Sequence, residues 1–414
     1  MNRAEKRRNK KLADKCAKRT RPIHESSSIP AEQEQTLSIQ QAINLAVQHH
    51  KAGDLPKAEA IYQQILQTDP NQPVALHLLG VIVHQAGKNN IAVDLITKAI
   101  AINPDYVGAH SNLGNALNAL GRLDEAVVSY SKAITINPDL FEVHSSLGVV
   151  LKVLGRLDEA ISSYQKALAI KPDYAEAHNN LGNALNDQGK FDEAIKSFHR
   201  ATNIKPNYAE AHSNLGNAYQ ELGQLDEAVA SYNDAISIKP DYAEAHSNLG
   251  AALQKLEQFD EAVASYNKAL NINPDYAEAH NNLGNVLKIQ GKLNEAVASY
   301  NKALTIKPDL AKAHKNLGNT HKKLGNFDEA VASYHRALFI KPDSPDVHNN
   351  LGNALQKLGQ IEKAMESLHK ALAIKPDLAE AHYNLGVAHQ GLGDLGEALT
   401  SYHRATAIKP SYTE

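Results

Sequence analysis

The sequence predicts an all-α fold, an α-solenoid of eleven tandem helix-turn-helix repeats of 34 residues each. Three observations support this prediction: prolines recur every 34 residues, glycine and alanine occupy fixed positions between them, and apolar residues follow a helical period twice in each interval. A repeat array grows along one axis without a single central core, so the length of 414 residues does not indicate several globular domains. The recurring prolines are Pro70, Pro104, Pro138, Pro172, Pro206, Pro240, Pro274, Pro308, Pro342, Pro376 and Pro410.

The fixed positions define the repeat boundaries. When each recurring proline is placed at position 32, position 20 is alanine in all eleven repeats and position 8 is glycine in ten, with Ala46 in the first. Position 15 is glycine in ten repeats, with Glu257 as the exception, and position 24 is usually aromatic. The predicted repeats are 39–72, 73–106, 107–140, 141–174, 175–208, 209–242, 243–276, 277–310, 311–344, 345–378 and 379–412.

The first half of each repeat predicts a helix and a turn. In Ala175–Gln188, apolar or small residues lie at positions 3, 7, 8, 10 and 11, which is the spacing of one helix face. Gly189 follows, and glycine is the usual residue where a helix ends in a turn. We therefore expect the chain to reverse direction at position 15 of each repeat.

The second half of each repeat predicts an antiparallel second helix. Between Asp192 and Ile204 the apolar residues again share one face. Pro206 ends this helix, because proline cannot continue it and disfavours helical geometry in the preceding residue. Small residues at positions 8 and 20 let the two helices approach closely, and the aromatic residue at position 24 fills the space beside them. One such pair cannot bury its apolar face alone, so neighbouring pairs must stack.

Residues 1–38 are predicted to be a disordered basic tail and linker. Residues 1–21 carry ten Lys and Arg against two acidic residues, a net charge of +8 in a chain whose total is −3. Such a tail either contacts RNA, the ribosome or anionic lipid or serves as a solubilising arm, and we favour the arm. Nucleic acid binding is therefore expected only through residues 1–21. Proline and serine between residues 22 and 30 predict a flexible joint to the first repeat.

Residues 413–414 are interpreted as the start of an incomplete further repeat. Thr413 and Glu414 occupy the two positions at which five other repeats begin with Ala and Glu. Terminal repeats normally need a polar cap. We therefore expect either a missing C-terminal domain or self-association through the uncapped last repeat.

Composition and motifs argue against several classes of protein. Cys16 is the only cysteine, which suits a reducing compartment. No run approaches 18 apolar residues, so no membrane span is expected, and the charged N-terminus lacks the apolar core of a secretory signal. We expect a cytoplasmic location. No phosphate-binding glycine loop, paired-cysteine motif or nucleophile signature occurs, so we predict no enzymatic activity, no cofactor and no metal.

The 34-residue unit with Leu-Gly, Ala, an aromatic residue and Pro at these positions resembles the tetratricopeptide repeat family. The resemblance covers 374 of the 414 residues. It implies a right-handed superhelix in which the first helices line a concave groove. One departure is position 4, where the family often has tryptophan and nine repeats here have histidine: His110, His144, His178, His212, His246, His280, His314, His348 and His382.

Nine evenly spaced histidines could suggest a metal site, but their spacing argues against one. Ligands of one zinc ion place their nitrogens about 2 Å from it. Equivalent positions in stacked helices are separated by a helix packing distance of roughly 8–10 Å. We therefore interpret these histidines as partly buried packing residues between helices.

Asparagine forms a polar stripe along the first helices. We name this set the amide ladder and predict that it lines the concave groove and binds an extended peptide. Each side-chain amide offers donors and an acceptor, so it can bind a peptide backbone whatever its side chains; the alternative is that many of them bind local backbone groups or face water. The candidate residues are Asn112, Asn115, Asn180, Asn183, Asn214, Asn217, Asn248, Asn282, Asn285, Asn316, Asn319, Asn350, Asn353 and Asn384.

Charge varies along the same stripe. Position 2 is acidic in most central repeats, and lysines gather at positions 12 and 13 toward the C-terminus: Lys255, Lys288, Lys322, Lys323 and Lys357. We interpret this as a solvated face of mixed charge. Members of the family with a carboxylate clamp carry a fixed set of Lys, Asn and basic residues. Lys315, Asn319 and Asn350 begin that pattern, and Glu380 and Asn384 break it, so we do not expect binding of chaperone C-terminal tails.

The predicted function is a non-catalytic scaffold that binds a peptide or protein segment in the concave groove. An alternative function is suggested by the sequence of the repeats. Segments such as "AIYQQILQTDPNQPVALHLLGVIVHQAG" resemble the repeat halves of O-GlcNAc-transferase-like proteins and of bacterial sulfotransferase-linked repeat proteins. That resemblance implies the substrate-recruiting region of a glycosyltransferase whose catalytic domain is not in this chain.

Overall fold

The computed structural model describes residues 38–413. The basic segment, the predicted joint and Cys16 lie outside the described residues. Within them the chain forms 22 α-helices and no strand. The helix that opens each repeat is called its first helix. The first helices are α2 (Ile39–Lys51), α4 (Pro73–Gln85), α6 (Val107–Ala119), α8 (Phe141–Val153), α10 (Ala175–Asp187), α12 (Ala209–Glu221), α14 (Ala243–Lys255), α16 (Ala277–Ile289), α18 (Ala311–Leu324), α20 (Pro345–Lys357) and α22 (Ala379–Gly391).

The second helix of each repeat begins at position 17 and ends at an isoleucine or threonine at position 30. Proline two residues later prevents its continuation. The second helices are α3 (Leu55–Thr68), α5 (Asn89–Ile102), α7 (Leu123–Ile136), α9 (Leu157–Ile170), α11 (Phe191–Ile204), α13 (Leu225–Ile238), α15 (Phe259–Ile272), α17 (Leu293–Ile306), α19 (Phe327–Ile340), α21 (Ile361–Ile374) and α23 (Leu395–Ile408). A short 3-10 helix, η1 (Pro410–Thr413), follows.

The turn inside each repeat depends on a left-handed residue at position 15. Ten glycines there have φ between 72° and 82°, a region that costs glycine little because it has no Cβ. Glu257 takes the same role in the seventh repeat with φ of 59°. The predicted turn is therefore present in every repeat, including the one that lacks glycine.

Small residues set the distance between the two helices of a repeat. The alanines at position 20 are almost completely buried. At position 8, a Cβ added to Gly216 would lie 2.6 Å from Cε1 of Tyr232, so the tyrosine ring occupies the space that a side chain would take. Tyr232 is fully buried in this position. The close approach predicted from positions 8, 20 and 24 is confirmed.

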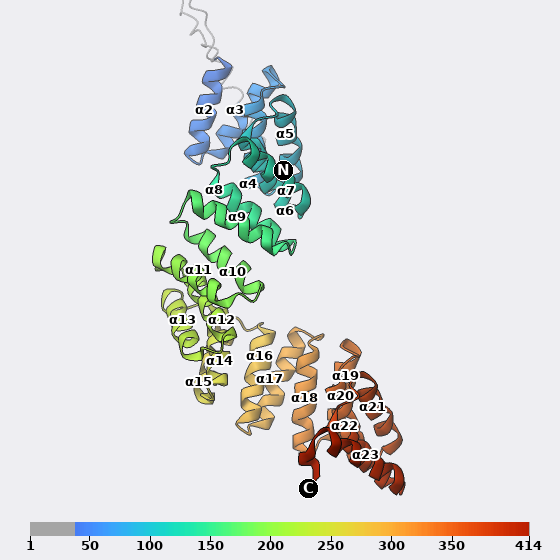
Figure 1. Cartoon of the computed structure of the whole chain (residues 1–414). Coiled ribbons are helices and arrows are strands. Elements are labelled where there is room, and N and C mark those ends of the chain that lie inside the picture. Colours follow the sequence, from blue (N-terminus) through green and yellow to red (C-terminus); the bar gives the residue numbers. More distant parts are fainter. Residues whose placement is uncertain (1–37, 414) are drawn as a thin grey trace, which may run out of the picture.

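The helix pairs stack into a curved, elongated array with α2 at one end and α23 at the other (Figure 1). Each second helix packs against the first helix of the next repeat, so apolar contacts run along the array instead of converging on one centre. The prediction of an α-solenoid is confirmed. None of the described helices is long and apolar enough to cross a membrane.

Candidate functional site

The inner face of the array is formed by the first helices. From α4 to α22, each first helix contacts the next first helix, and no second helix approaches the next second helix to this extent among the described residues. An array whose first helices are closer together than its second helices must curve toward the first helices. All fourteen residues of the amide ladder lie on first helices. Asn316 is buried and the others are half-buried.

Several ladder residues are held by a tyrosine of their own repeat. The hydroxyl of Tyr232 donates to Oδ1 of Asn217 over 2.7 Å. Burial raises the pKa of Tyr232, so this hydroxyl keeps its proton. The amide oxygen at position 9 is thereby fixed in orientation. The same bond joins Tyr130 to Asn115, Tyr300 to Asn285 and Tyr334 to Asn319, over 2.7 to 2.8 Å.

Other ladder residues connect one repeat to the next. Nδ2 of Asn214 donates to Oδ1 of Asn179 in the preceding repeat over 3.0 Å. Asparagine at position 6 makes the equivalent bond to position 5 of the repeat before it from Asn316 to Asn281 and from Asn384 to Asn349, over 3.1 and 2.8 Å. In the third repeat Nδ2 of Asn112 instead donates to Nε2 of His77 over 2.8 Å.

A second cross-repeat bond joins position 6 to position 9. Nδ2 of Asn248 donates to Oδ1 of Asn217 over 3.1 Å. That oxygen already accepts from Tyr232, so both of its acceptor sites are used and the NH2 group of Asn217 remains for another partner. Asn350 donates to Asn319 in the same way over 3.2 Å. Much of the amide ladder therefore holds neighbouring repeats together.

Three members of the ladder make no side-chain hydrogen bond within residues 38–413: Asn180, Asn183 and Asn353. The reason at position 9 is the residue at position 24, because Phe198 and Leu368 lack the hydroxyl that Tyr232 supplies elsewhere. Two hydrogen bonds of ladder residues lie within a single helix. Asn282 accepts from Asn281 over 3.2 Å, and Asn115 donates to Asn112 over 3.3 Å.

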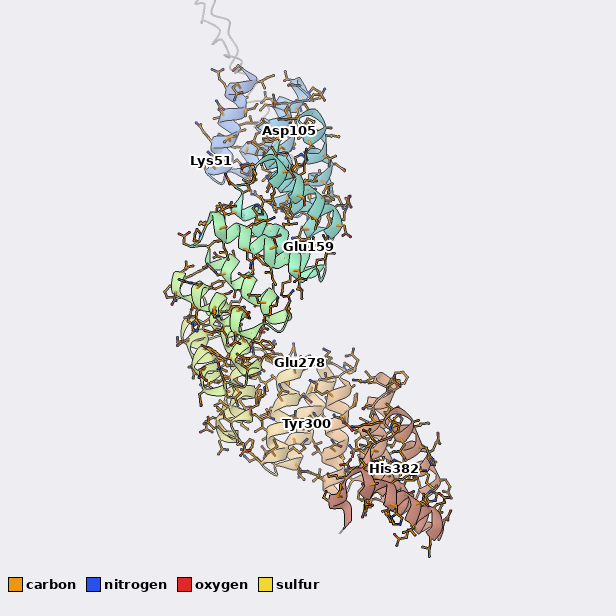
Figure 2. All side chains as sticks on the ribbon, viewed as in Figure 1. Lys51, Asp105, Glu159, Glu278, Tyr300 and His382 are labelled. Atoms are coloured by element: carbon orange, nitrogen blue, oxygen red, sulfur yellow. The ribbon has the colours of Figure 1, made fainter. Side chains whose placement is uncertain are left out.

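The histidines at position 4 have a structural partner. Nε2 of His382, labelled in Figure 2, donates to the carbonyl oxygen of Pro376 over 2.9 Å. All nine histidines make this bond to the proline six residues earlier, over 2.7 to 3.1 Å. No group of three or more potential metal ligands occurs among the described residues. The histidines thus tie the first helices from α6 to α22 to the end of the preceding repeat.

Open clefts lie away from the amide ladder, beside the second helices. One of about 670 Å³ lies between α21, α22 and α23, and another of about 590 Å³ lies between α15, α16 and α17. His382 lines the first cleft and His280 the second. Residues at equivalent repeat positions line both clefts. The clefts therefore result from the stacking of the repeats, and neither is a specialised pocket.

Sequence reasoning missed the acceptors at position 5, namely His77, Asn179, Asn281 and Asn349. Each lies 35 residues before its donor. A comparison of polar residues 35 positions apart would have found them. That separation is the repeat length plus one residue, and it relates position 5 of one first helix to position 6 of the next.

Comparison with protein families gives matches along almost the whole array. A family model described as the C-terminal domain of cilia and flagella-associated protein 70, a tetratricopeptide-containing domain, matches residues 3–235. A TPR repeat model matches residues 216–257, 255–288, 284–325, 322–359 and 352–393. A tetratricopeptide repeat model matches residues 379–412. No curated protein matches the chain.

Solved structures with similar chains include three examples. MamA is 31% identical, with 40% of this chain and 97% of MamA covered and a TM-score of 0.38. The APC/C hetero-tetramer Cut9–Hcn1 is 14% identical, with 90% and 94% covered and a TM-score of 0.48. YrrB, described as a TPR protein with an unusual peptide-binding site, is 24% identical, with 44% and 95% covered and a TM-score of 0.38.

Proposed function

Because the chain belongs to the tetratricopeptide repeat family, we propose that it is a non-catalytic scaffold that binds an extended peptide or protein segment along its inner face. The observation that carries this proposal is the amide ladder. Where position 24 is tyrosine, its hydroxyl can occupy the amide oxygen at position 9, so that an NH2 group such as that of Asn217 remains for a ligand. Where position 24 is Phe198 or Leu368, the whole amide of Asn183 or Asn353 remains. Peptide carbonyl groups are the acceptors that such donors suit best.

The spacing of the ladder fits an extended chain. Neighbouring packed helices are roughly 8–10 Å apart, and an extended peptide rises about 3.3 Å per residue. One repeat therefore corresponds to about three residues of ligand. Binding would be the sum of many shallow contacts, so affinity should grow with the length of the bound segment.

The test uses the three ladder residues that the fold does not need. A random 15-residue peptide library is selected on the full chain, and the affinity of recovered peptides is measured by fluorescence anisotropy. The triple variant Asn180→Ala, Asn183→Ala, Asn353→Ala should bind peptides that lie across α10 roughly tenfold more weakly, because two hydrogen bonds of about 0.5–1.5 kcal/mol each are lost there. Its helicity should match that of the wild type, because none of the three amides has a partner in the array.

A matched control removes three exposed asparagines from second helices: Asn203→Ala, Asn267→Ala, Asn301→Ala. This variant should bind as the wild type does. Equal affinity of the wild type and the inner-face variant for every recovered peptide would show that these three amides do not carry binding. Recovery of no peptide above the bare support would reject the scaffold function for such segments.

The glycosyltransferase-recruiting alternative remains a prediction from resemblance, since no matched family model describes a transferase. An open reading frame that continues past Glu414 into a catalytic domain would support it. We also propose a cytoplasmic location, which cell fractionation with an antibody against the array can test.

A further inference from the structure

One ion pair shows how charged residues meet across the inner face. Nζ of Lys152 on α8 lies 3.1 Å from Oδ2 of Asp187 on α10. Lys152 occupies position 12 of the fourth repeat and Asp187 position 13 of the fifth. Position 12 of one first helix and position 13 of the next are therefore close enough for a direct ionic contact.

The same two positions hold lysine on both sides in the eighth to tenth repeats. Lys288 on α16 corresponds to Lys152, and Lys323 on α18 corresponds to Asp187. One repeat later, Lys322 on α18 and Lys357 on α20 stand in the same relation. None of these four lysines has an ion-pair partner within residues 38–413. Two successive pairs of neighbouring first helices thus place lysine opposite lysine, whereas α8 and α10 place Lys152 opposite Asp187.

The packing of these lysines increases the cost of their charge. Lys288 is half-buried, and burial, together with the positive charges of Lys323 and Lys315, lowers its pKa. Burial also lowers the pKa of Lys322, whose Nζ donates to Oδ1 of Asn350 over 3.0 Å. The lysine cluster, defined as Lys288, Lys315, Lys322, Lys323 and Lys357, is therefore contiguous with the amide ladder, and none of its members has an ion-pair partner in the part of the chain that the structure describes.

We propose that the lysine cluster binds a segment of a protein partner that is rich in Asp and Glu, with its carboxylates beside Lys288 and Lys322 as Asp187 lies beside Lys152. The inference rests on the proposed function, because it gives the chemistry of the ligand for one part of the inner face. Carboxylates spaced about three residues apart in an extended chain would meet successive lysine pairs.

The surroundings favour a peptide over a nucleic acid. Proteins that hold single strands stack the bases on aromatic side chains, and α16, α18 and α20 contain no Phe, Tyr or Trp. They contain no Arg either, the residue best suited to bidentate phosphate recognition. The amides between the lysines instead supply donors for peptide carbonyl groups.

The decisive variant gives Lys288 and Lys322 acidic partners within the protein. Lys323→Asp combined with Lys357→Asp places an aspartate opposite each of these lysines, as Asp187 already lies opposite Lys152, so the fold should be retained. The control Lys166→Asp with Lys268→Asp makes the same change of charge at exposed sites on α9 and α15.

The random 15-residue library is selected on all three proteins. The wild type and the control should enrich Asp and Glu above the starting library, and the rebuilt variant should not. An acidic peptide recovered from the wild type should bind the rebuilt variant roughly tenfold or more weakly, because like charges then face each other. Its affinity for the wild type should fall as salt is raised, since salt screens these interactions.

Other outcomes overturn the inference. Enrichment of neutral peptides by the wild type would reject the lysine cluster as an acid-binding site and leave the scaffold function standing. Failure to enrich any peptide would reject both. A single-stranded oligouridylate that binds more tightly than the acidic peptides, and does so through Lys323 and Lys357, would replace the peptide with nucleic acid.

Discussion

His77 occupies a position at which three other repeats have asparagine. Its Nε2 accepts from Nδ2 of Asn112 over 2.8 Å, so the proton of the neutral ring is on Nδ1, which lies 2.9 Å from the hydroxyl oxygen of Tyr106. The side chain is 4% exposed, and burial lowers its pKa to about 4. Asn179, Asn281 and Asn349 accept the same cross-repeat bond without an ionisable group.

The titration of His77 should therefore make this part of the array sensitive to acid. In the unfolded chain a histidine has a pKa of about 6.5. Between that pH and about 4, His77 is therefore protonated in the unfolded state and neutral in the folded state. The contribution is fully present above about pH 6.5 and declines as the pH falls toward 4. We expect the repeats around His77 to lose about 2 kcal/mol between pH 7 and pH 5.

Hydrogen exchange of α4 and α6 at the two pH values measures this loss. His77→Asn keeps an acceptor at the same place, as in three other repeats, and its loss should be smaller by about the same amount. An equal loss in the wild type and the variant would assign the acid sensitivity to other groups.

Single residues also show the limit of sequence reasoning. The periodic spacing of the position-4 histidines predicted packing instead of metal binding, and the structure gives each one a proline carbonyl as partner. The repeat spacing did not by itself predict the hydrogen bonds of the amide ladder at position 9. The oxygen of Asn217 accepts from Tyr232, whereas the matching residue for Asn183 is Phe198, which has no hydroxyl. Whether a donor from the next repeat also reaches the oxygen depends on the distance between stacked helices.

At the scale of the helix and its turn, the sequence was most informative. The glycine at position 15 and the proline at position 32 predicted where both helices end, because each acts on the backbone of its own residue or of its immediate neighbours. Glu257 is the informative exception. Its φ of 59° shows that stacking imposes the turn even where the side chain opposes it.

We expect Glu257→Gly to stabilise the seventh repeat by about 1 kcal/mol, because the left-handed backbone costs a residue with a Cβ about that much. Hydrogen exchange of α14 and α15 would measure the gain. The reverse change in the neighbouring repeat, Gly223→Glu, should destabilise α12 and α13 by a similar amount. No change in either variant would mean that the turn stores no strain.

At the scale of the whole molecule, stacking in one direction makes stability a property of neighbours. Each repeat contacts only the repeats beside it, so stability is approximately a sum of repeat terms and interface terms. The curvature toward the first helices could be expected only from family resemblance. It depends on small differences in spacing between inner and outer helices, which no single residue encodes.

Removal of one complete repeat tests this picture. Deletion of residues 209–242 joins Tyr208 to Ala243 and recreates a junction that the array already uses. Helicity per residue by circular dichroism should be unchanged, and small-angle X-ray scattering should show a shorter particle. Loss of helical signal well beyond the deleted repeat would instead indicate a single cooperative core.

The offsets between amide partners in adjacent repeats, 35 residues from position 6 to position 5 and 31 from position 6 to position 9, have a consequence for inheritance. Since these bonds are made between adjacent copies, recombination that gains or loses 34 codons keeps positions 5, 6 and 9 of neighbouring repeats in the same register. The gene can thus adjust the reach of its product in whole copies, and selection can alter the charge of one stretch without disturbing the rest.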